Sequence, residues 1–176
     1  MAKKYFLGID AGQTTTKAVI HDENFQQVAI ERKNSPMDSP HPRWAERSHE
    51  SLWQASVGAI SGAIAKAGIS PNDIAGIGIS GHGDGLHLID ANGGAVGSAF
   101  MSVDSRAFAE VQAINSDPIV SERIFQKSGQ VPYLGSSGTM LKWMTVHQPE
   151  LVEKAAYMLS CKDVVRNRLT GQIGTD

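Results

Sequence analysis

Residues 5–20 read YFLGIDAGQTTTKAVI, and this stretch decides the fold of the N-terminal part of the chain. An apolar run ends at Asp10, a turn that contains Gly12 follows, and a second run is rich in β-branched residues. A third run spans 27–32 after another polar turn. Short runs of this kind, joined by tight polar turns, predict a three-stranded antiparallel meander.

The turn between the first two runs carries residue types that bind phosphate. Asp10 places a carboxylate at a strand end, Gly12 lets the backbone turn tightly, and three threonine hydroxyls and one ammonium group follow. Backbone N–H groups in such a turn form an anion-binding concavity, and Asp10 is placed to hold Mg²⁺ where the ion bridges phosphate oxygens. An ordinary Asp-Gly hairpin explains the same spacing, so the spacing alone leaves both interpretations open. The candidate residues are Asp10 for metal and catalysis, and Gly12, Gln13, Thr14, Thr15, Thr16 and Lys17 for the cofactor.

The rest of the chain predicts helices and further strands. After a proline-rich loop, Ser48 is expected to cap a helix that ends at Gly68. Beyond it, we expect a buried strand at 74–80 and a hairpin that pairs 86–89 with 95–100. Amphipathic helices are expected after Asp104, and one of them has its apolar face on Ala107, Phe108, Val111 and Ile114. A strand at 156–160 and a helix at 164–169 follow. This order indicates an α/β protein with a mixed sheet and flanking helices.

Composition narrows the classes of function. The 176 residues are 41% hydrophobic and 19% charged, and the formal net charge is −2, which offers no electrostatic footprint for nucleic acid. The length allows one sizeable core or two small ones. Cys161 is the only cysteine, which rules out an internal disulfide; we expect a packed, inert thiol at a half-buried strand end. No apolar run is long enough for a membrane span and no signal-peptide pattern is visible, so a cytoplasmic protein is expected.

A second polar cluster follows the strand expected at 74–80. His82 and Asp84 lie in a glycine-rich stretch, Asp104 and Arg106 follow the next hairpin, and the proline-rich loop adds Trp44 and Glu46. Fixed hydrogen-bonding groups beside an aromatic face suit a polyhydroxylated ligand. Each side chain also has an ordinary structural explanation, such as packing for His82 or a helix start for Asp104.

Two better-known phosphate motifs fit poorly. Lys17 has no glycine before it, as a Walker loop requires. Gly76, Gly78 and Gly81 match the dinucleotide pattern G-x-G-x-x-G, yet they lie inside a strand and no helix follows. An NAD-dependent oxidoreductase, which would rest on this match alone, is therefore disfavoured.

With both clusters placed, the chain resembles the N-terminal domain of the FGGY carbohydrate kinases over essentially all of its length. The motifs that carry the resemblance are LGIDAGQT at 7–14 with Lys17-Ala18, Trp44-Ala45-Glu46 before a helix with Trp53, IGISG at 77–81, Asp104-Ser105-Arg106, Leu141-Lys142-Trp143, and Lys162-Asp163 with LTG at 169–171 and Thr175-Asp176. Because these motifs occur in the family's order, together they are far more specific than any one of them.

The resemblance implies an actin-like ATPase fold, related to ribonuclease H, with ATP and Mg²⁺ bound between two domains. It implies that Asp10 interacts with the metal and phosphates, and that residues 12–16 form the phosphate turn. It also implies that His82, Asp84, Asp104 and Arg106 line the pocket of a small-molecule sugar or polyol.

Two departures from the family pattern shift the expected substrate and activity. Gly83-Asp84-Gly85 and the residues before Asp104 differ from D-xylulose kinases and are more similar to erythritol kinases and L-xylulose-type kinases. Residues 1–176 are expected to be a single N-terminal domain, cut before the family's catalytic base, so the missing C-terminal domain is an expected partner and the chain alone should be inactive. A homodimer and a non-catalytic sugar-binding regulator on the same fold stay open.

Overall fold

The computed structural model describes residues 4–175 and divides them into two compact units. Unit 1 contains the described residues up to 36, residues 48–82 and those from 161 onward, and unit 2 contains 37–47 and 83–160. Each unit has a hydrophobic cluster of its own, which is the second of the two arrangements that the chain length allows. Asp176, the last residue of the expected motifs, lies outside the described residues.

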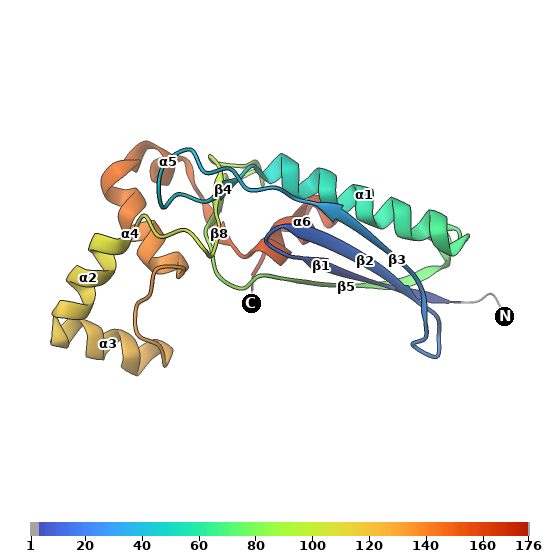
Figure 1. Cartoon of the computed structure of the whole chain (residues 1–176), viewed down its shortest axis with the longest axis horizontal. Coiled ribbons are helices and arrows are strands. Elements are labelled where there is room, and N and C mark those ends of the chain that lie inside the picture. The colour runs from blue at the N-terminus through green and yellow to red at the C-terminus, as the bar shows by residue number, and fades with distance from the viewer. Residues whose placement is uncertain (1–3, 176) are drawn as a thin grey trace. The chain divides into compact units, whose positions relative to one another are not determined.

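Unit 1 is built on a four-stranded mixed sheet in the order β3-β2-β1-β5 (Figure 1). Strands β1, β2 and β3 form the expected antiparallel meander, and β5 pairs with β1 in parallel. The bounds are Tyr5–Ala11 for β1, Thr15–His21 for β2, Gln27–Asn34 for β3 and Ile74–Gly81 for β5. The meander predicted from the sequence is therefore confirmed.

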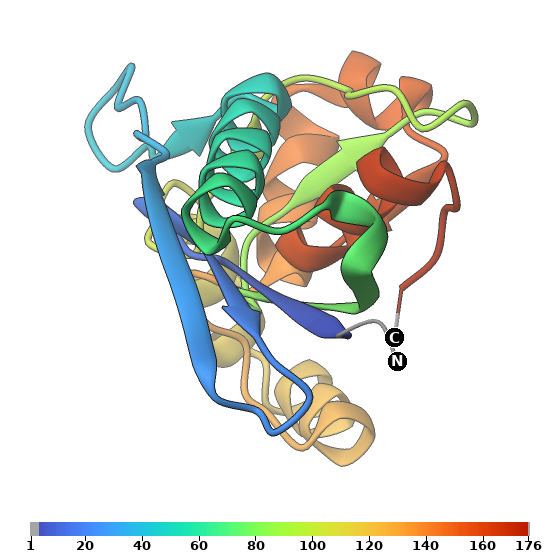
Figure 2. The ribbon, with the colours of Figure 1, turned by 90° about the vertical axis from the view of Figure 1, so that its right-hand side faces the viewer.

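Two helices pack on one face of this sheet. Helix α1, His49–Ala67, covers β2 and β3, and helix α6, Cys161–Thr170, covers β1 and β5; Figure 2 shows α1 lying along the strands. The Ser48 hydroxyl accepts a hydrogen bond from the Ser51 N–H at the start of α1, and Gly68 ends it with a φ of 64°. Both expected helix ends are confirmed. A short 3₁₀ turn, Pro71–Asp73, leads from α1 into β5.

Small side chains let α1 lie close to the sheet. Ala59 and Ala63 of α1 are fully buried against Ala18 and Ile20 of β2 and Leu7 of β1. The interior of unit 1 therefore lies between the sheet and its helices. No helix of unit 1 covers the opposite face of the sheet within residues 4–175.

Strand β5 is not the buried strand that its isoleucines suggested. It is one of the two edge strands of the sheet, and Ile77 is 52% exposed. An apolar run of this length does not by itself show whether a strand is central or lies at an edge, because that depends on which strands pair beside it.

Unit 2 has two short antiparallel strand pairs and four helices. Strand β4, Glu46–Arg47, pairs with β7, Ala99–Phe100, and β6, His87–Ile89, pairs with β8, Tyr157–Leu159. The helices are α2, Phe108–Ser116; α3, Pro118–Ser128; α4, Ser137–His147; and α5, Pro149–Lys154. Met140, Trp143 and Met144 of α4 pack in the core with Leu86 and Phe100.

Several expectations for unit 2 need correction. The predicted hairpin is present in part, as antiparallel bridges from Leu86 to Phe100 and from Ile89 to Ala95, but the continuous partner of β6 is β8, a pairing that was not predicted. Of the expected apolar face at α2, Ala107 is fully buried in the core and Val111 and Ile114 are half-buried, whereas Phe108 is 42% exposed. Helices α3 and α5 were not predicted; each begins with a proline, a residue favoured in the first helical turn.

Cys161 is fully buried, but it is the first residue of α6 and not the end of a strand. Its thiol lies 3.5 Å from the carbonyl oxygen of Ala11, as donor to that oxygen. Helix α6 thus begins three residues before the predicted start at 164. None of the helices in the described part of the chain has both the length and the apolar character that a membrane crossing requires.

Candidate functional site

The first candidate site is the turn between β1 and β2 in unit 1. Asp10 and Lys17 are cross-strand partners, and the Lys17 ammonium lies 3.3 Å from the Asp10 carboxylate. Their side chains are 47% and 43% exposed, respectively, so both charges remain accessible to a ligand. Exposed ion pairs contribute little to stability, and a role for this pair in ligand binding stays a prediction.

The turn is closed tightly by its own backbone. The Gly12 N–H donates to the carbonyl oxygen of Thr15 at 3.1 Å, and the Ser35 N–H donates to that of Thr14 at 2.8 Å. A methyl group at position 12 would lie 2.7 Å from the Thr15 carbonyl oxygen. Only glycine therefore fits at position 12, as the sequence suggested.

Strand geometry divides the threonines of the turn between two faces. Successive side chains of a strand point to opposite faces. Thr15 and Lys17 share the face of Asp10, whereas Thr16 is fully buried on the face of Ala18. The buried Thr16 hydroxyl has no hydrogen-bond partner among the described residues. A direct role for Thr16 in phosphate binding stays a prediction.

A shallow hollow of about 510 Å³ lies on this face of the sheet. The residues that line it include Gly8, Asp10, Lys17, Val19, Gly78 and Ser80. Gly8 and Gly78 have no side chains that would fill this hollow. Asp10 is the one acidic side chain among the described residues that line it. An accessible carboxylate at the rim is the kind of ligand that Mg²⁺ prefers, so the residues present fit a metal-bound phosphate group.

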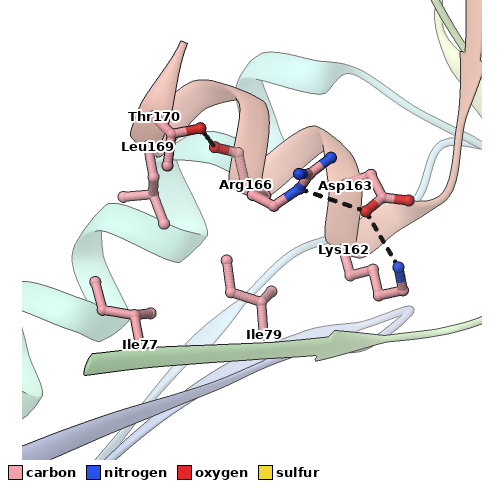
Figure 3. A pocket seen from close by; sticks show the side chains of 7 residues that line it. All are labelled: Ile77, Ile79, Lys162, Asp163, Arg166, Leu169 and Thr170. Carbon is pink, nitrogen blue, oxygen red and sulfur yellow. Dashed lines mark hydrogen bonds and ion pairs between the residues drawn. The ribbon is translucent and has the colours of Figure 1, made fainter. Parts of the chain in front are cut away.

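A second hollow in unit 1, of about 400 Å³, lies between α6 and β5 (Figure 3). Its floor is apolar, with Ile77 and Ile79 pointing from β5 toward the helix. Its charged rim is compensated internally, because Asp163 lies 3.1 Å from the Lys162 ammonium and 3.7 Å from the Arg166 guanidinium.

The second candidate site, in unit 2, centres on Asp84. The Tyr133 hydroxyl donates a hydrogen bond to the Asp84 carboxylate. The two loops are also joined by Gly85, whose N–H donates to the Gly135 carbonyl at 3.1 Å and whose carbonyl accepts from the Ser137 hydroxyl at 2.6 Å. The hydrogen bond to Asp84, and to a smaller extent burial, raises the pKa of the Tyr133 phenol. A carboxylate and a phenol held together in this way can bind adjacent hydroxyl groups of a polyol.

Asp104 and Arg106 form a buried ion pair in the same unit. The Asp104 carboxylate accepts from the Arg106 side chain at 2.7–3.0 Å, from the Arg106 N–H at 2.9 Å and from the Ala45 N–H at 2.7 Å. Glu46 adds a second carboxylate, 2.8 Å from the Arg106 guanidinium. The Asp104 and Arg106 side chains are 0% and 1% exposed, so the sequence correctly grouped these residues but did not reveal their burial.

Aromatic rings surround the Arg106 guanidinium. Its central carbon lies 3.6 Å from the centre of the Phe100 ring, 3.9 Å from that of Trp44 and 5.1 Å from that of Trp143. A guanidinium over the face of an aromatic ring is attracted by the ring's quadrupole. The cation is therefore stabilised both by carboxylates and by rings.

His82 belongs to unit 1, where it follows β5 and its N–H donates to the Ala11 carbonyl at 3.3 Å. The structure thus brings together Asp10 with Lys17, and Asp104 with Arg106, in separate units. Roles for His82, Asp84, Asp104 and Arg106 in substrate binding stay predictions.

Tyr133 was missed because nothing in its local pattern links it to residue 84, which lies 49 positions away. The available signal was an aromatic hydroxyl in a loop bounded by Pro132 and Gly135. Phe100 was missed as a partner of Arg106 because it reads only as a strand residue.

A mixed sheet with helices on one face, and with a tight glycine turn that carries Asp10 and Lys17, has the architecture of an actin-like α/β domain. Consistent with this class, the N-terminal domain of the FGGY family of carbohydrate kinases matches residues 5–176. The chain belongs to this family.

Named relatives agree with this assignment. The chain is 33% identical over 173 residues to the L-xylulose/3-keto-L-gulonate kinase of Escherichia coli, which covers 98% of this chain and 34% of that protein. It is 32% identical to the glycerol kinase of Thermococcus kodakarensis, covering 99% of this chain and 35% of that one. The chain thus spans about a third of the length of such relatives.

Solved structures agree as well. The crystal structure of ligand-bound xylulose kinase from Lactobacillus acidophilus superimposes with a TM-score of 0.88 at 25% identity, over 97% of this chain and 34% of that one. The expected fold class is confirmed.

Proposed function

We propose that residues 1–176 form, as one domain, the sugar- and phosphate-binding part of an ATP-dependent kinase that phosphorylates a small ketose or polyol. The observation that carries the proposal is the accessible pair of Asp10 and Lys17 beside the closed turn at Gly12. Membership of the family and the names of the relatives, which act on L-xylulose and glycerol, support the reaction type.

In this proposal the turn handles the phosphates. The Lys17 ammonium lies beside them, and the Gly12 backbone approaches them closely. Asp10 would hold Mg²⁺, which when bound neutralises charge on phosphate oxygens. Phosphoryl transfer depends mainly on positioning and electrostatic stabilisation, which are the two contributions that these residues can make.

Unit 2 supplies the groups proposed to bind the sugar. Asp84 accepts hydrogen bonds from substrate hydroxyls, and Tyr133, which the sequence did not reveal, works beside it. A role for His82, which belongs to unit 1, stays a prediction, and the buried Asp104 and Arg106 are proposed to act on sugar binding without contacting the sugar. Phosphorylation by this chain alone is expected to be negligible, because general-base catalysis contributes roughly 10²–10⁴-fold and the family's base was not identified in this sequence.

Calorimetry on this chain separates the two halves of the proposal. Wild-type chain should bind Mg-ATP, and it should bind L-xylulose or glycerol. Asp10→Asn should weaken Mg-ATP binding about tenfold, which corresponds to about 1.4 kcal/mol, and leave sugar binding unchanged.

Glu23→Gln, at an exposed acidic residue in the next turn, is the control and should change neither affinity. Equal Mg-ATP affinity in wild type and Asp10→Asn would contradict the role of Asp10. Stabilisation by NADH but not by Mg-ATP would overturn the kinase assignment.

A further inference from the structure

Arg106 is buried too completely for a surface ligand to reach it. Its side chain is 1% exposed, and Glu46, Asp104, Phe100 and Trp44 surround the guanidinium. The Nη1 nitrogen is enclosed and has no hydrogen-bond acceptor among the described residues. The aromatic rings are what this end of the cation contacts.

The ion pair fixes the turn that connects β7 to α2. Asp104 takes the Arg106 side chain and the Arg106 N–H on its carboxylate, while its own N–H donates to the Met101 carbonyl at 2.9 Å. The Ala45 N–H also donates to this carboxylate. A flat guanidinium with two donors aimed at one carboxylate holds a single geometry, which a lysine ammonium cannot do.

The turn that connects β7 to α2 packs against the loop that contains Tyr133. The carbonyl oxygen of Ser102, inside the turn, lies so close to Gly135 that a methyl group on Gly135 would be 2.5 Å from it. Gly135 in turn accepts the Gly85 N–H, and Tyr133 donates to Asp84. A continuous series of contacts therefore runs from the ion pair to the hydroxyl-binding pair.

We propose that Arg106 is a positioning residue: it does not touch the substrate, but through Asp104 it holds the Ser102 turn against Gly135 and so fixes Tyr133 on Asp84. The consequence for sugar affinity rests on the proposed function, whereas the coupling between Arg106 and the Tyr133–Asp84 pair does not. Loss of the guanidinium lets the turn shift, and the loop of Tyr133 shifts with it.

The test uses this chain with ¹³C-labelled tyrosine, and Tyr133→Phe assigns the Tyr133 signal. The pKa of Tyr133 is measured in wild type and in Arg106→Lys, which keeps the positive charge but loses the planar pair of donors that binds Asp104. We expect the Tyr133 pKa to fall toward the ordinary tyrosine value of about 10, and the Kd for L-xylulose to rise about tenfold. Arg123→Lys, the same change at an exposed position of α3, should alter neither quantity.

An unchanged Tyr133 pKa in a folded Arg106→Lys chain would overturn the proposal. If sugar affinity fell at the same time, Arg106 would contact the substrate directly. If wild type binds neither L-xylulose nor glycerol, the proposed function fails, and the Tyr133 pKa still decides the coupling.

If Arg106→Lys does not fold, Glu46→Gln replaces it. This variant removes one ion-pair partner of Arg106 and leaves its hydrogen bonds to Asp104 in place. The same direction of pKa change is expected, by a smaller amount, and no change would again overturn the proposal.

Discussion

The phenolic hydroxyl of Tyr133 donates a hydrogen bond to the carboxylate of Asp84, 49 positions earlier in the chain. The loops before β6 and after α3, which are separated in sequence by two strands and two helices, are thereby joined at one point of unit 2. Asp84 was expected from the sequence as a sugar ligand, and in the proposed site Tyr133 would be a second hydroxyl-binding group. Predictions about this pair are open to direct measurement.

Tyr133→Phe should weaken sugar binding more than it weakens the fold. A hydrogen bond to a charged group contributes about 1.5–3 kcal/mol, and the part that the ligand shares should cost roughly tenfold in Kd. Tyr133 is 36% exposed, so its hydroxyl contributes little to the core. Calorimetric Kd values for L-xylulose and glycerol measure the first effect, and thermal unfolding measures the second. A large fall in Tm with unchanged Kd would contradict the assignment.

Alkaline pH should destabilise the wild-type chain through Tyr133. Because the pKa of this phenol is raised in the folded state, the folded chain keeps a proton that the unfolded chain loses above about pH 10. The stabilisation is complete below the unfolded pKa and is lost as pH rises through the folded one.

Urea unfolding of wild type and Tyr133→Phe between pH 9 and 11 isolates this contribution, because every other titratable group is present in both proteins. The difference in unfolding free energy between the two proteins should shrink as pH rises. A difference that is constant over this range would refute the prediction.

Gly12→Ala should damage the phosphate turn. The added methyl group would meet the Thr15 carbonyl oxygen at 2.7 Å, so the turn must open. Overpacking of this kind costs about 1–3 kcal/mol, and Mg-ATP affinity should fall about tenfold. Gly83→Ala is the control, because a methyl group there meets no atom within 4 Å. Equal Mg-ATP affinity in Gly12→Ala and wild type would show that the turn does not bind phosphate.

Ser48→Ala should destabilise unit 1 without affecting either binding site. Ser48 accepts the Ser51 N–H at 3.0 Å, and loss of such a cap costs about 1 kcal/mol. Urea unfolding measures the loss. Ser116→Ala, at an exposed serine at the end of α2, is the control and should have a smaller effect. Equal effects at both positions would argue against a capping role.

Local patterns predicted much of unit 1 because its contacts are local or periodic. The meander follows from tight turns between β-branched runs, and α1 is bounded by Ser48 and Gly68. The Asp10–Lys17 pair was foreseeable for the same reason, since a short hairpin brings these residues opposite each other.

Unit 2 was less predictable because its pairings join distant segments. Strand β6 takes β8 as its continuous partner instead of its neighbour in sequence, and Asp104 binds the Ala45 N–H from 59 positions away. Hydrophobic periodicity indicates that a helix has an apolar side, but it cannot indicate which element covers that side, and so it did not reveal that Phe108 of α2 is 42% exposed.

The sequence alone determined the type of sheet in unit 1, the glycine turn with its Asp10 carboxylate, and the ordered motifs that pointed to the carbohydrate kinases. These depend on backbone conformation and on spacing along the chain. Only the tertiary structure decided that the face of β2 that carries Thr16 is the buried one, that Tyr133 meets Asp84, and that Arg106 is enclosed by rings and carboxylates. Burial and long-range hydrogen bonds depend on how separate segments pack, and no local pattern encodes that.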